Sequence, residues 1–268
     1  GRRAGVLSET FSPEQSATAY CDAVADVVQR IAAGEIFQAN IARAWSGTLA
    51  RDAAPFDLFE RLAGSSPAPY AAFWETGDHV LASNSPESFL SLRGDRIAAR
   101  PIKGTRPRGP STETDQALKA ELLASAKDRA ENLMIVDLMR NDLSRVAEPG
   151  SVAADRLFVI ESHPTVHHLV STVTATARPR TGAADLLEAA FPPGSITGAP
   201  KHQAMKVIAA HEPPRGPWCG SLFHIGGDGG LTASVLIRTA SFERSTDGRW
   251  RFRALAGAGI VADSDPGS

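Results

Sequence analysis

The chain has 268 residues, 43% of them hydrophobic, which is enough to bury a substantial core. Its 28 Lys and Arg residues against 30 Asp and Glu residues give a formal net charge of -2, which argues against a nucleic-acid-binding protein. No apolar run reaches the ~18 residues of a membrane span, and no signal-peptide pattern is present, so we expect a soluble, cytoplasmic protein without membrane partners. Cys21 and Cys219 lack the spacing of a zinc site or a disulfide framework.

The first predicted helix begins near Ser12. This serine suits the N-cap position, with Pro13 in the first turn and Gln15 closing a capping box. Apolar residues then recur at the spacing of an amphipathic helix until Gly34, where the pattern ends. We therefore predict one helix between Ser12 and Gly34 with a single buried face.

A strand is predicted from Ile36 to Leu49, and it carries two amides on one face. Side chains two residues apart on a strand project to the same side, so Gln38 and Asn40 point the same way. The pair fits an exposed face as well as a binding site, and these residues by themselves leave both interpretations open.

After a short helix over residues 55–63, the pattern indicates a meander. Strands are predicted at residues 69–75, 80–83, 89–93 and 96–100, with turn dipeptides at Gly77-Asp78 and Gly94-Asp95. Strands joined by such short turns are antiparallel, which excludes a doubly wound parallel sheet.

The run Pro101-Ile102-Lys103-Gly104-Thr105-Arg106-Pro107 sets one lysine between a strand and a cluster of turn-forming residues. The prolines restrict the backbone, and Gly104 permits a sharp turn directly after the amine. In a partly apolar cleft the pKa of an amine is lowered, and the neutral amine is a nucleophile or a base. Glu87 precedes a neighbouring strand and would pair with Lys103 or act as an acid beside it. The alternatives are a basic surface loop and a surface glutamate.

The longest helical pattern runs from Ala117 to Val146, with a break predicted near Ser125. Its centre is almost continuously apolar, which indicates burial on more than one side. Glu131 shares a face with Leu138 and Asp142, so a carboxylate points inward where a bare charge is unfavourable. Either a metal ion or an arginine would compensate this charge, and both remain open.

Beyond this helix, strands are predicted at residues 152–161 and 166–177, the second with His167 and His168 on opposite faces. One of these histidines is expected to be a hydrogen-bonded core residue. A short helix over residues 183–191 leads to the run 192–201 and a helix that ends near Ala210. A glycine-containing turn at a helix N-terminus suits a carboxylate or phosphate, but the run is not a P-loop.

The last predicted elements are a hairpin of residues 218–225 with 231–242 and a strand over residues 250–261. Arg238 lies in an otherwise apolar part of this hairpin, where an inward arginine requires an anion. Gly257 and Gly259 in the last strand would let a ligand approach the backbone. We find no repeat and no long linker, and therefore predict a single α+β domain over residues 1–268, with packed antiparallel sheets and outer helices.

Several segments, taken together and in chain order, resemble the chorismate-utilising enzymes, in particular their aminodeoxychorismate synthase branch. They are Ile36–Asn40, Ser85–Leu90, Pro101–Pro107, Glu131–Leu143, His167–Ser171, Gly194–Lys201, Ile237–Arg238 and Ala256–Asp263. The resemblance implies a β-sandwich of two packed sheets with outer helices around an active-site cleft. It also implies an upstream β-rich segment and a C-terminal helix with a second Mg²⁺ carboxylate, which we expect this chain to lack.

Two positions bear on the reaction that the resemblance implies. Members that add water to chorismate carry a lysine base where this chain has Gln38, which argues against isochorismate and salicylate synthases. Anthranilate synthases usually carry alanine where this chain has Lys103, whereas aminodeoxychorismate synthases carry lysine. Lys103 would then attack C2 of chorismate while Glu87 protonates the departing C4 hydroxyl. Ammonia would displace the lysine to give 4-amino-4-deoxychorismate for 4-aminobenzoate and folate synthesis.

The resemblance also implies the remaining site residues and partners. Glu131 would bind Mg²⁺, which neutralises a substrate carboxylate. The predicted substrate-binding residues are Gln38, Thr105, His168, Ser195, Thr197, Gly198, Arg238, Gly257 and Gly259. Neither cysteine lies in a nucleophile-elbow pattern, so ammonia would come from a separate glutamine amidotransferase subunit. The alternatives are an aminating synthase like anthranilate synthase and a catalytically silent chorismate-binding subunit.

Overall fold

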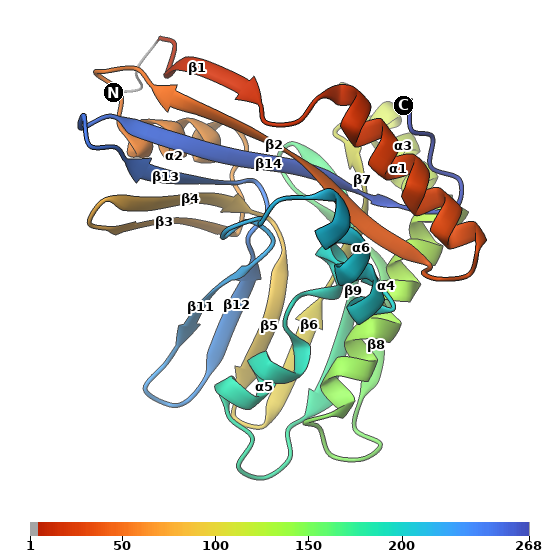
Figure 1. Ribbon diagram of the computed structural model, residues 1–268. Coiled ribbons are helices and arrows are strands. Elements are labelled where there is room, and N and C mark those ends of the chain that lie inside the picture. The colour runs from red at the N-terminus through yellow and green to blue at the C-terminus, as the bar shows by residue number, and fades with distance from the viewer. Residues whose placement is uncertain (1–4, 268) are drawn as a thin grey trace. The chain divides into compact units, whose positions relative to one another are not determined.

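The computed structural model describes residues 5–267, which form two compact units, each with its own antiparallel sheet (Figure 1). Unit 1 comprises Gly1–Pro86, Ile196–Gly220 and Leu236–Ser268, and unit 2 comprises Glu87–Ser195 and Ser221–Val235. The single domain over residues 1–268 stays a prediction, and its outermost residues, 1–4 and 268, lie outside the described residues.

Unit 1 contains the sheet with strand order β1-β2-β14-β13-β4-β3, in which β10 also pairs with β2. The strands are β1 (Ser8–Pro13), β2 (Gln38–Leu49), β3 (Tyr70–Thr76), β4 (His79–Ser85), β10 (Gly198–Ala199), β13 (Thr239–Arg244) and β14 (Trp250–Ile260). Its helices are α1 (Ala17–Ala32), α2 (Pro55–Ser65) and α6 (Lys201–His211).

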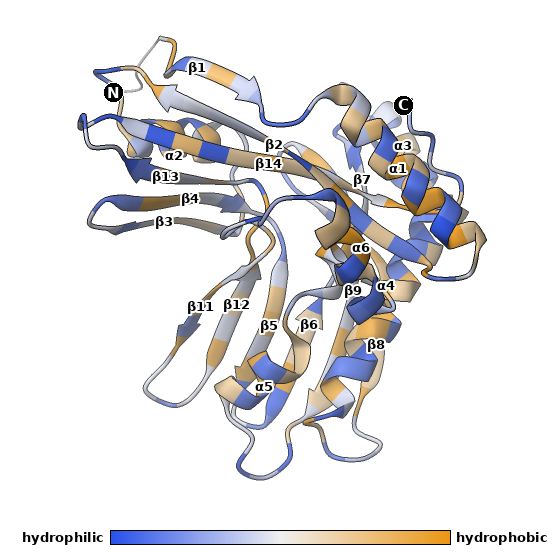
Figure 2. Cartoon of the chain, viewed as in Figure 1, coloured by the Kyte–Doolittle hydropathy of each residue, from blue (hydrophilic) through white to orange (hydrophobic). Residues whose placement is uncertain are grey.

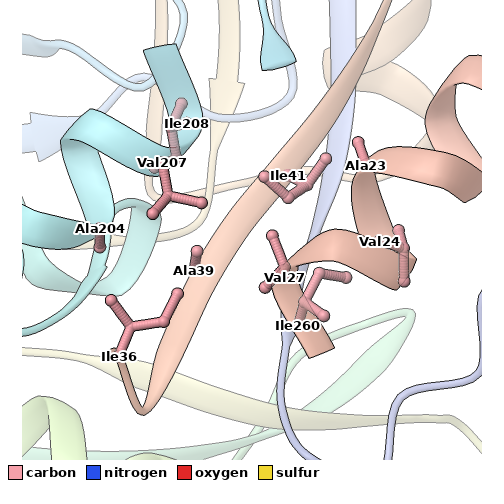
Figure 3. Packing of buried hydrophobic residues seen from close by; sticks show 10 residues of the cluster. All are labelled: Ala23, Val24, Val27, Ile36, Ala39, Ile41, Ala204, Val207, Ile208 and Ile260. Carbon is pink, nitrogen blue, oxygen red and sulfur yellow. The ribbon is translucent and has the colours of Figure 1, made fainter. Parts of the chain in front are cut away.

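One core cluster of unit 1 lies where α1 and α6 pack on β2, and a second includes Leu49, Val80 and Phe242. Figure 3 shows Val27 of α1 and Val207 of α6 beside Ile41 of β2, and all three are buried. Each fully buried side chain of this size contributes about 1.5–3 kcal/mol. Polar and apolar residues alternate along α1 (Figure 2), and Thr18, Asp22 and Gln29 are exposed, so the predicted single buried face is confirmed.

The predicted start of this first helix is wrong. The N-cap residue is Ser16, whose side chain accepts a hydrogen bond from the Ala19 amide at 3.0 Å. Ser12 and Pro13 instead end β1, where Pro13 lies opposite Trp45. An edge strand tolerates proline because one side of its backbone needs no partner, so strand pairing overrides the local capping pattern.

Unit 2 contains the sheet with strand order β11-β12-β5-β6-β9-β7, in which β8 also pairs with β9. The strands are β5 (Ser88–Arg93), β6 (Arg96–Arg100), β7 (Ile102–Pro107), β8 (Ala153–Ser162), β9 (Val166–Thr176), β11 (Ser221–Ile225) and β12 (Leu231–Val235). Its helices are α3 (Thr112–Ala124), α4 (Ala126–Ser144), α5 (Ala183–Ala190) and the short 3-10 helix η1 (Gly194–Ile196).

The predicted break near Ser125 is confirmed. The Ser125 amide donates to the Glu121 carbonyl at 2.9 Å and closes α3, while its hydroxyl accepts from the Asp128 amide at 3.2 Å and caps α4. The buried face of α4 packs on β9, where the Asn132 amide group donates to the Leu169 carbonyl at 3.3 Å.

Two predicted strand groupings are wrong, although the α+β class and two antiparallel sheets are confirmed. The predicted meander divides after Pro86: β3 and β4 belong to unit 1, and β5 and β6 to unit 2. The predicted strand 231–242 is two strands, β12 and β13, in different sheets. Within residues 5–267, none of the helices has the length and apolar character needed to span a membrane.

Candidate active site

Lys103 lies at an irregular bend of β7, two residues after Pro101. Strands β6 and β7 both pair with β9, and the Ser171 amide donates to the Pro101 carbonyl between them at 3.2 Å. The pairing of β7 with β9 shifts register between Ile102 and Thr105. Such irregularities redirect side chains, and this one contains Lys103 and Gly104.

Gly104 is required by the backbone at this bend. Its φ of 91° is unfavourable for residues with a side chain. A Cβ atom there would lie 2.9 Å from Leu122 Cδ1 and 3.0 Å from Asp128 Cβ. The close approach of β7 to α3 and α4 therefore fixes the backbone directly beside Lys103.

Ser195 connects the two residues predicted to be catalytic. The Lys103 amine donates a hydrogen bond to the Ser195 carbonyl, with Nζ and O 3.2 Å apart. The Ser195 side chain hydrogen-bonds the Glu87 carboxyl group, which the Lys103 charge also stabilises when ionised. The structure thus brings together Lys103, Glu87 and Ser195 in unit 2.

Glu87 is buried, with 5% of its surface exposed. Burial raises the pKa of its carboxyl group to about 7, although Ser195, Lys103 and the Ile102 backbone each act to lower it. Glu87 lines a small cavity that has room for about one water molecule and is lined mainly by apolar residues. The apolar lining residues are Phe89, Pro101, Ile135, Met139, Pro193 and Val235. A carboxyl group with this pKa can deliver a proton near neutral pH.

Glu131 on α4 is half-buried, and burial raises its pKa, while the nearby charges of Lys103 and Lys127 lower it. Within residues 5–267 its side chain has no hydrogen bond from a neighbouring residue. The same residues hold no cluster of three or more His, Cys, Asp or Glu side chains suited to a metal. Mg²⁺ typically uses one or two protein carboxylates plus water and substrate, so Glu131 fits as a single ligand.

The two adjacent histidines of β9 have different partners. His168 Nδ1 lies 2.9 Å from Thr105 Oγ1 on the neighbouring strand, so two predicted substrate-binding residues form a pair. His167 is fully buried, with its ring nitrogens 2.9 Å from Ser162 Oγ and 2.9 Å from Asp115 Oδ1. The expectation of a hydrogen-bonded core histidine is confirmed for His167.

Gln38 and Asn40 of β2 in unit 1 both carry buried side-chain atoms without a hydrogen-bond partner among the described residues. Gln38 is fully buried, and neither amide atom of its side chain has a hydrogen-bond partner among residues 5–267. The same holds for Oδ1 of Asn40. Because unpaired buried polar atoms are unfavourable, this face of β2 suits a ligand that supplies both donors and acceptors.

Thr197 and Gly198 run directly beside this part of β2. The Asn40 amide donates to the Thr197 carbonyl at 2.7 Å, and Gly198 lies opposite Ala39. A Cβ on Gly198 would lie 2.1 Å from the Gln38 carbonyl, so no larger residue fits there. Both residues are buried.

Of the remaining predicted residues of unit 1, Arg238 differs from expectation, and the role of Gly257 and Gly259 stays a prediction. Arg238 is exposed and lies between β12 and β13, so it is not the inward-facing strand residue that we predicted. Its φ of 51° is strained for a non-glycine residue. Gly257 is needed for strand packing, because a Cβ there would lie 2.8 Å from the Ile41 carbonyl. Gly259 of β14 pairs with Asn40 of β2.

Sequence reasoning missed two features. It gave no bridging role to Ser195, because a main-chain carbonyl that accepts from a distant lysine has no sequence pattern. It also passed over Glu212 and Arg215, which form an ion pair with exposed side-chain fractions of only 3% and 13%. The signal available was a pair of opposite charges three residues apart that flank two prolines.

Comparison with known proteins gives a consistent result. The family model described as chorismate binding enzyme matches residues 2–268. Aminodeoxychorismate synthase component 1 of Klebsiella aerogenes is 44% identical over 260 residues, which cover 97% of this chain and 56% of that protein. Anthranilate synthase component 1 of Aeropyrum pernix is 39% identical over 271 residues, covering 99% and 59%.

The fold matches as well. The crystal structure of anthranilate synthase component I from Streptococcus pneumoniae TIGR4 superposes with a TM-score of 0.86 at 30% identity, covering 98% of this chain and 57% of that one. The chain therefore spans a little over half the length of the relatives it matches.

Proposed function

Because the chain belongs to the chorismate binding enzyme family, we propose that it converts chorismate and ammonia to 4-amino-4-deoxychorismate, as an aminodeoxychorismate synthase component 1. One observation carries the proposal: the Lys103 amine lies beside the buried carboxyl group of Glu87, and Ser195 hydrogen-bonds both. A nucleophile and a proton donor are the two groups that a substitution through a covalent intermediate requires.

In the proposed first step, the neutral Lys103 amine forms a bond to C2 of the ring. Both ring double bonds shift by one position, the C4–O bond breaks, and the hydroxyl leaves as water with the proton of Glu87. The new secondary amine releases one proton, so the step is balanced. In the second step ammonia bonds to C4 and releases a proton, both double bonds shift back, the C2–N bond breaks, and Lys103 leaves as an amine after taking up a proton.

Mg²⁺ belongs to this proposal through Glu131, the half-buried carboxylate on α4 that has no hydrogen bond within the described residues. When bound, the ion would neutralise a carboxylate of the substrate. The Ser195 carbonyl would meanwhile orient the Lys103 amine, and the apolar wall around Glu87 would keep its carboxyl group protonated until transfer.

The residues of unit 1 have a supporting part in the proposal. Gln38, Thr197 and Gly198 would bind the substrate, as would Arg238 and the backbone at Gly257 and Gly259. The unpaired amide of Gln38 supports this assignment, since a ligand hydroxyl or carboxylate would satisfy it. Ammonia would come from a glutamine amidotransferase subunit, in keeping with the component 1 in the name of the relatives.

An anthranilate synthase-like activity is the second candidate, because the relative from Aeropyrum pernix and the structure from Streptococcus pneumoniae bear that name. Lys103 favours the first candidate, since its amine has a direct use only in a covalent route.

The test is product analysis after incubating the protein with chorismate, ammonium and Mg²⁺. We expect 4-amino-4-deoxychorismate from the wild type, none from Lys103→Ala, and unchanged formation from Lys206→Ala, which removes an exposed lysine of α6. Anthranilate as the product would establish the second candidate, and no product from the wild type would contradict both.

A further inference from the structure

One edge of β2 has a gap in its strand pairing. This edge pairs with β10 at Gln38 and Ala39 and with β1 from Trp45 onward. Between these two partners, no strand of residues 5–267 lies beside the Asn40 carbonyl and the Ala42 amide. Backbone groups in the interior of a protein require a partner, so other groups must meet them.

Glu212 and Arg215 fill this gap with their side chains. Glu212 Oε1 accepts from the Ala42 amide at 2.7 Å, and Arg215 Nη2 donates to the Asn40 carbonyl at 2.6 Å. The two side chains also pair with each other, with Nε to Oε2 at 2.7 Å and Nη2 to Oε1 at 2.9 Å. The ion pair therefore replaces a short piece of strand along β2.

Arg215 also reaches the segment that leads into β10. Its Nη1 donates to the Ile196 carbonyl at 3.0 Å, directly before Thr197. The guanidinium lies 5.2 Å from the centre of the Trp218 ring and is largely buried. One planar group thus fixes the spacing between β2 at Asn40 and the segment 196–199.

We propose that Arg215, held in place by Glu212, is a positioning residue for substrate binding. It acts through the two main-chain carbonyls it binds, and so holds the unpaired Gln38 amide and the Thr197–Gly198 backbone at a fixed separation. The inference rests on the proposed function, because it takes chorismate as the ligand of these residues.

Only arginine has the geometry that this position needs. Its flat guanidinium presents donors in several directions at once, whereas a lysine offers a single point charge on a flexible chain. Arg215→Lys keeps the charge beside Glu212 but cannot reach both carbonyls and both carboxylate oxygens. The variant therefore separates positioning from charge.

The test compares steady-state kinetics for chorismate in the wild type, Arg215→Lys and Arg215→Ala. We expect KM to rise about tenfold or more in both variants with a smaller change in kcat, because binding residues are displaced while Lys103 and Glu87 are unchanged. Millimolar guanidinium should lower the KM of Arg215→Ala again. The KM of Glu212→Gln, which keeps hydrogen-bonding capacity, should lie between those of the wild type and Arg215→Lys.

Arg253→Lys and Arg253→Ala are the matched controls. Arg253 also binds a glutamate, Glu14, and a carbonyl, that of Pro214, but its hydrogen bonds do not go to Asn40 or Ile196. Both controls should keep the wild-type KM.

The outcomes separate the two proposals. If Arg215 had only a structural role, its variants would show a smaller folded fraction and hence a lower apparent kcat, with KM unchanged and no response to guanidinium. That result would overturn the inference about Arg215 but not the proposed function. A wild type that does not turn over chorismate would overturn the proposed function and this inference with it.

Discussion

Glu87 is the residue whose protonation changes across the neutral range. Its folded-state pKa of about 7 exceeds the ordinary value of 4.5 because burial disfavours the ionised form. The folded protein therefore holds a proton between these values that the unfolded chain has lost, and stability contributed by this group falls as pH rises from 4.5 through 7.

Glu87→Gln is expected to lower kcat by roughly 10²- to 10⁴-fold, because the amide cannot donate a proton as an acid does. The variant should also gain stability relative to the wild type between pH 5 and pH 8, by about 2–3 kcal/mol, since it has no buried charge to form. Urea unfolding of both proteins at the two pH values measures this difference. An equal stability difference at both pH values would contradict the assigned pKa.

Reasoning from sequence found Lys103 and Glu87 because their motifs combine a chemical group with turn-forming neighbours. It could not find the Ser195 bridge, which joins residues far apart in the chain through a main-chain oxygen. Arg238 was misplaced for a related reason: its apolar neighbours suggest a continuous strand, but the chain changes sheets at this residue, and φ becomes positive.

At the scale of elements, β7 owes its bend to Gly104. Gly104→Ala is expected to destabilise the protein by about 1–3 kcal/mol, because positive φ strains alanine and the new methyl group meets Leu122 and Asp128. Gly94→Ala is the matched control, since Gly94 also has positive φ but open space around it. Chemical denaturation of both variants gives the comparison, and equal losses would argue against close packing at β7.

Helix α3 is joined to β9 through Asp115. Hydrogen bonding from Arg108 holds the pKa of this carboxyl group well below its usual range, with His167 contributing as well. A depressed folded-state pKa adds stability above the unfolded value and loses it as pH falls.

Asp115→Asn should therefore lower the unfolding midpoint most near neutral pH and progressively less below pH 4. Thermal melts across this range test the expectation, with Asp137→Asn, an exposed residue of α4, as the control. A midpoint difference that does not depend on pH would rule out the ionised form of Asp115 as the source of the effect.

Element boundaries were predictable where local signals agree. Ser125 is both a stop for α3 and a cap for α4, and the sequence shows the polar residue between two helical patterns. The start of α1 was missed because Ser12 and Ser16 are both acceptable caps, and only pairing of β1 with β2 decides between them.

At the scale of the whole molecule, the antiparallel α+β class followed from short turns and alternating patterns. The division into two units did not, because the chain passes between them at Pro86 and Ser195 and again at Gly220 and Val235 without a linker. Hydrophobic periodicity indicates which face of a strand is buried, but it does not indicate to which of two sheets the strand belongs. The hydrogen bonds that Glu212 and Arg215 make to the backbone of β2 likewise become visible only in three dimensions.

A covalent bond between Lys103 and the substrate would be detected by intact mass spectrometry. The protein is incubated with chorismate and Mg²⁺ in the absence of ammonia, beside Lys103→Ala and Lys206→Ala. We expect an added mass of chorismate less one water on the wild type and Lys206→Ala, and none on Lys103→Ala. Bound chorismate without any covalent adduct on the wild type, or an adduct that persists in Lys103→Ala, would contradict this expectation.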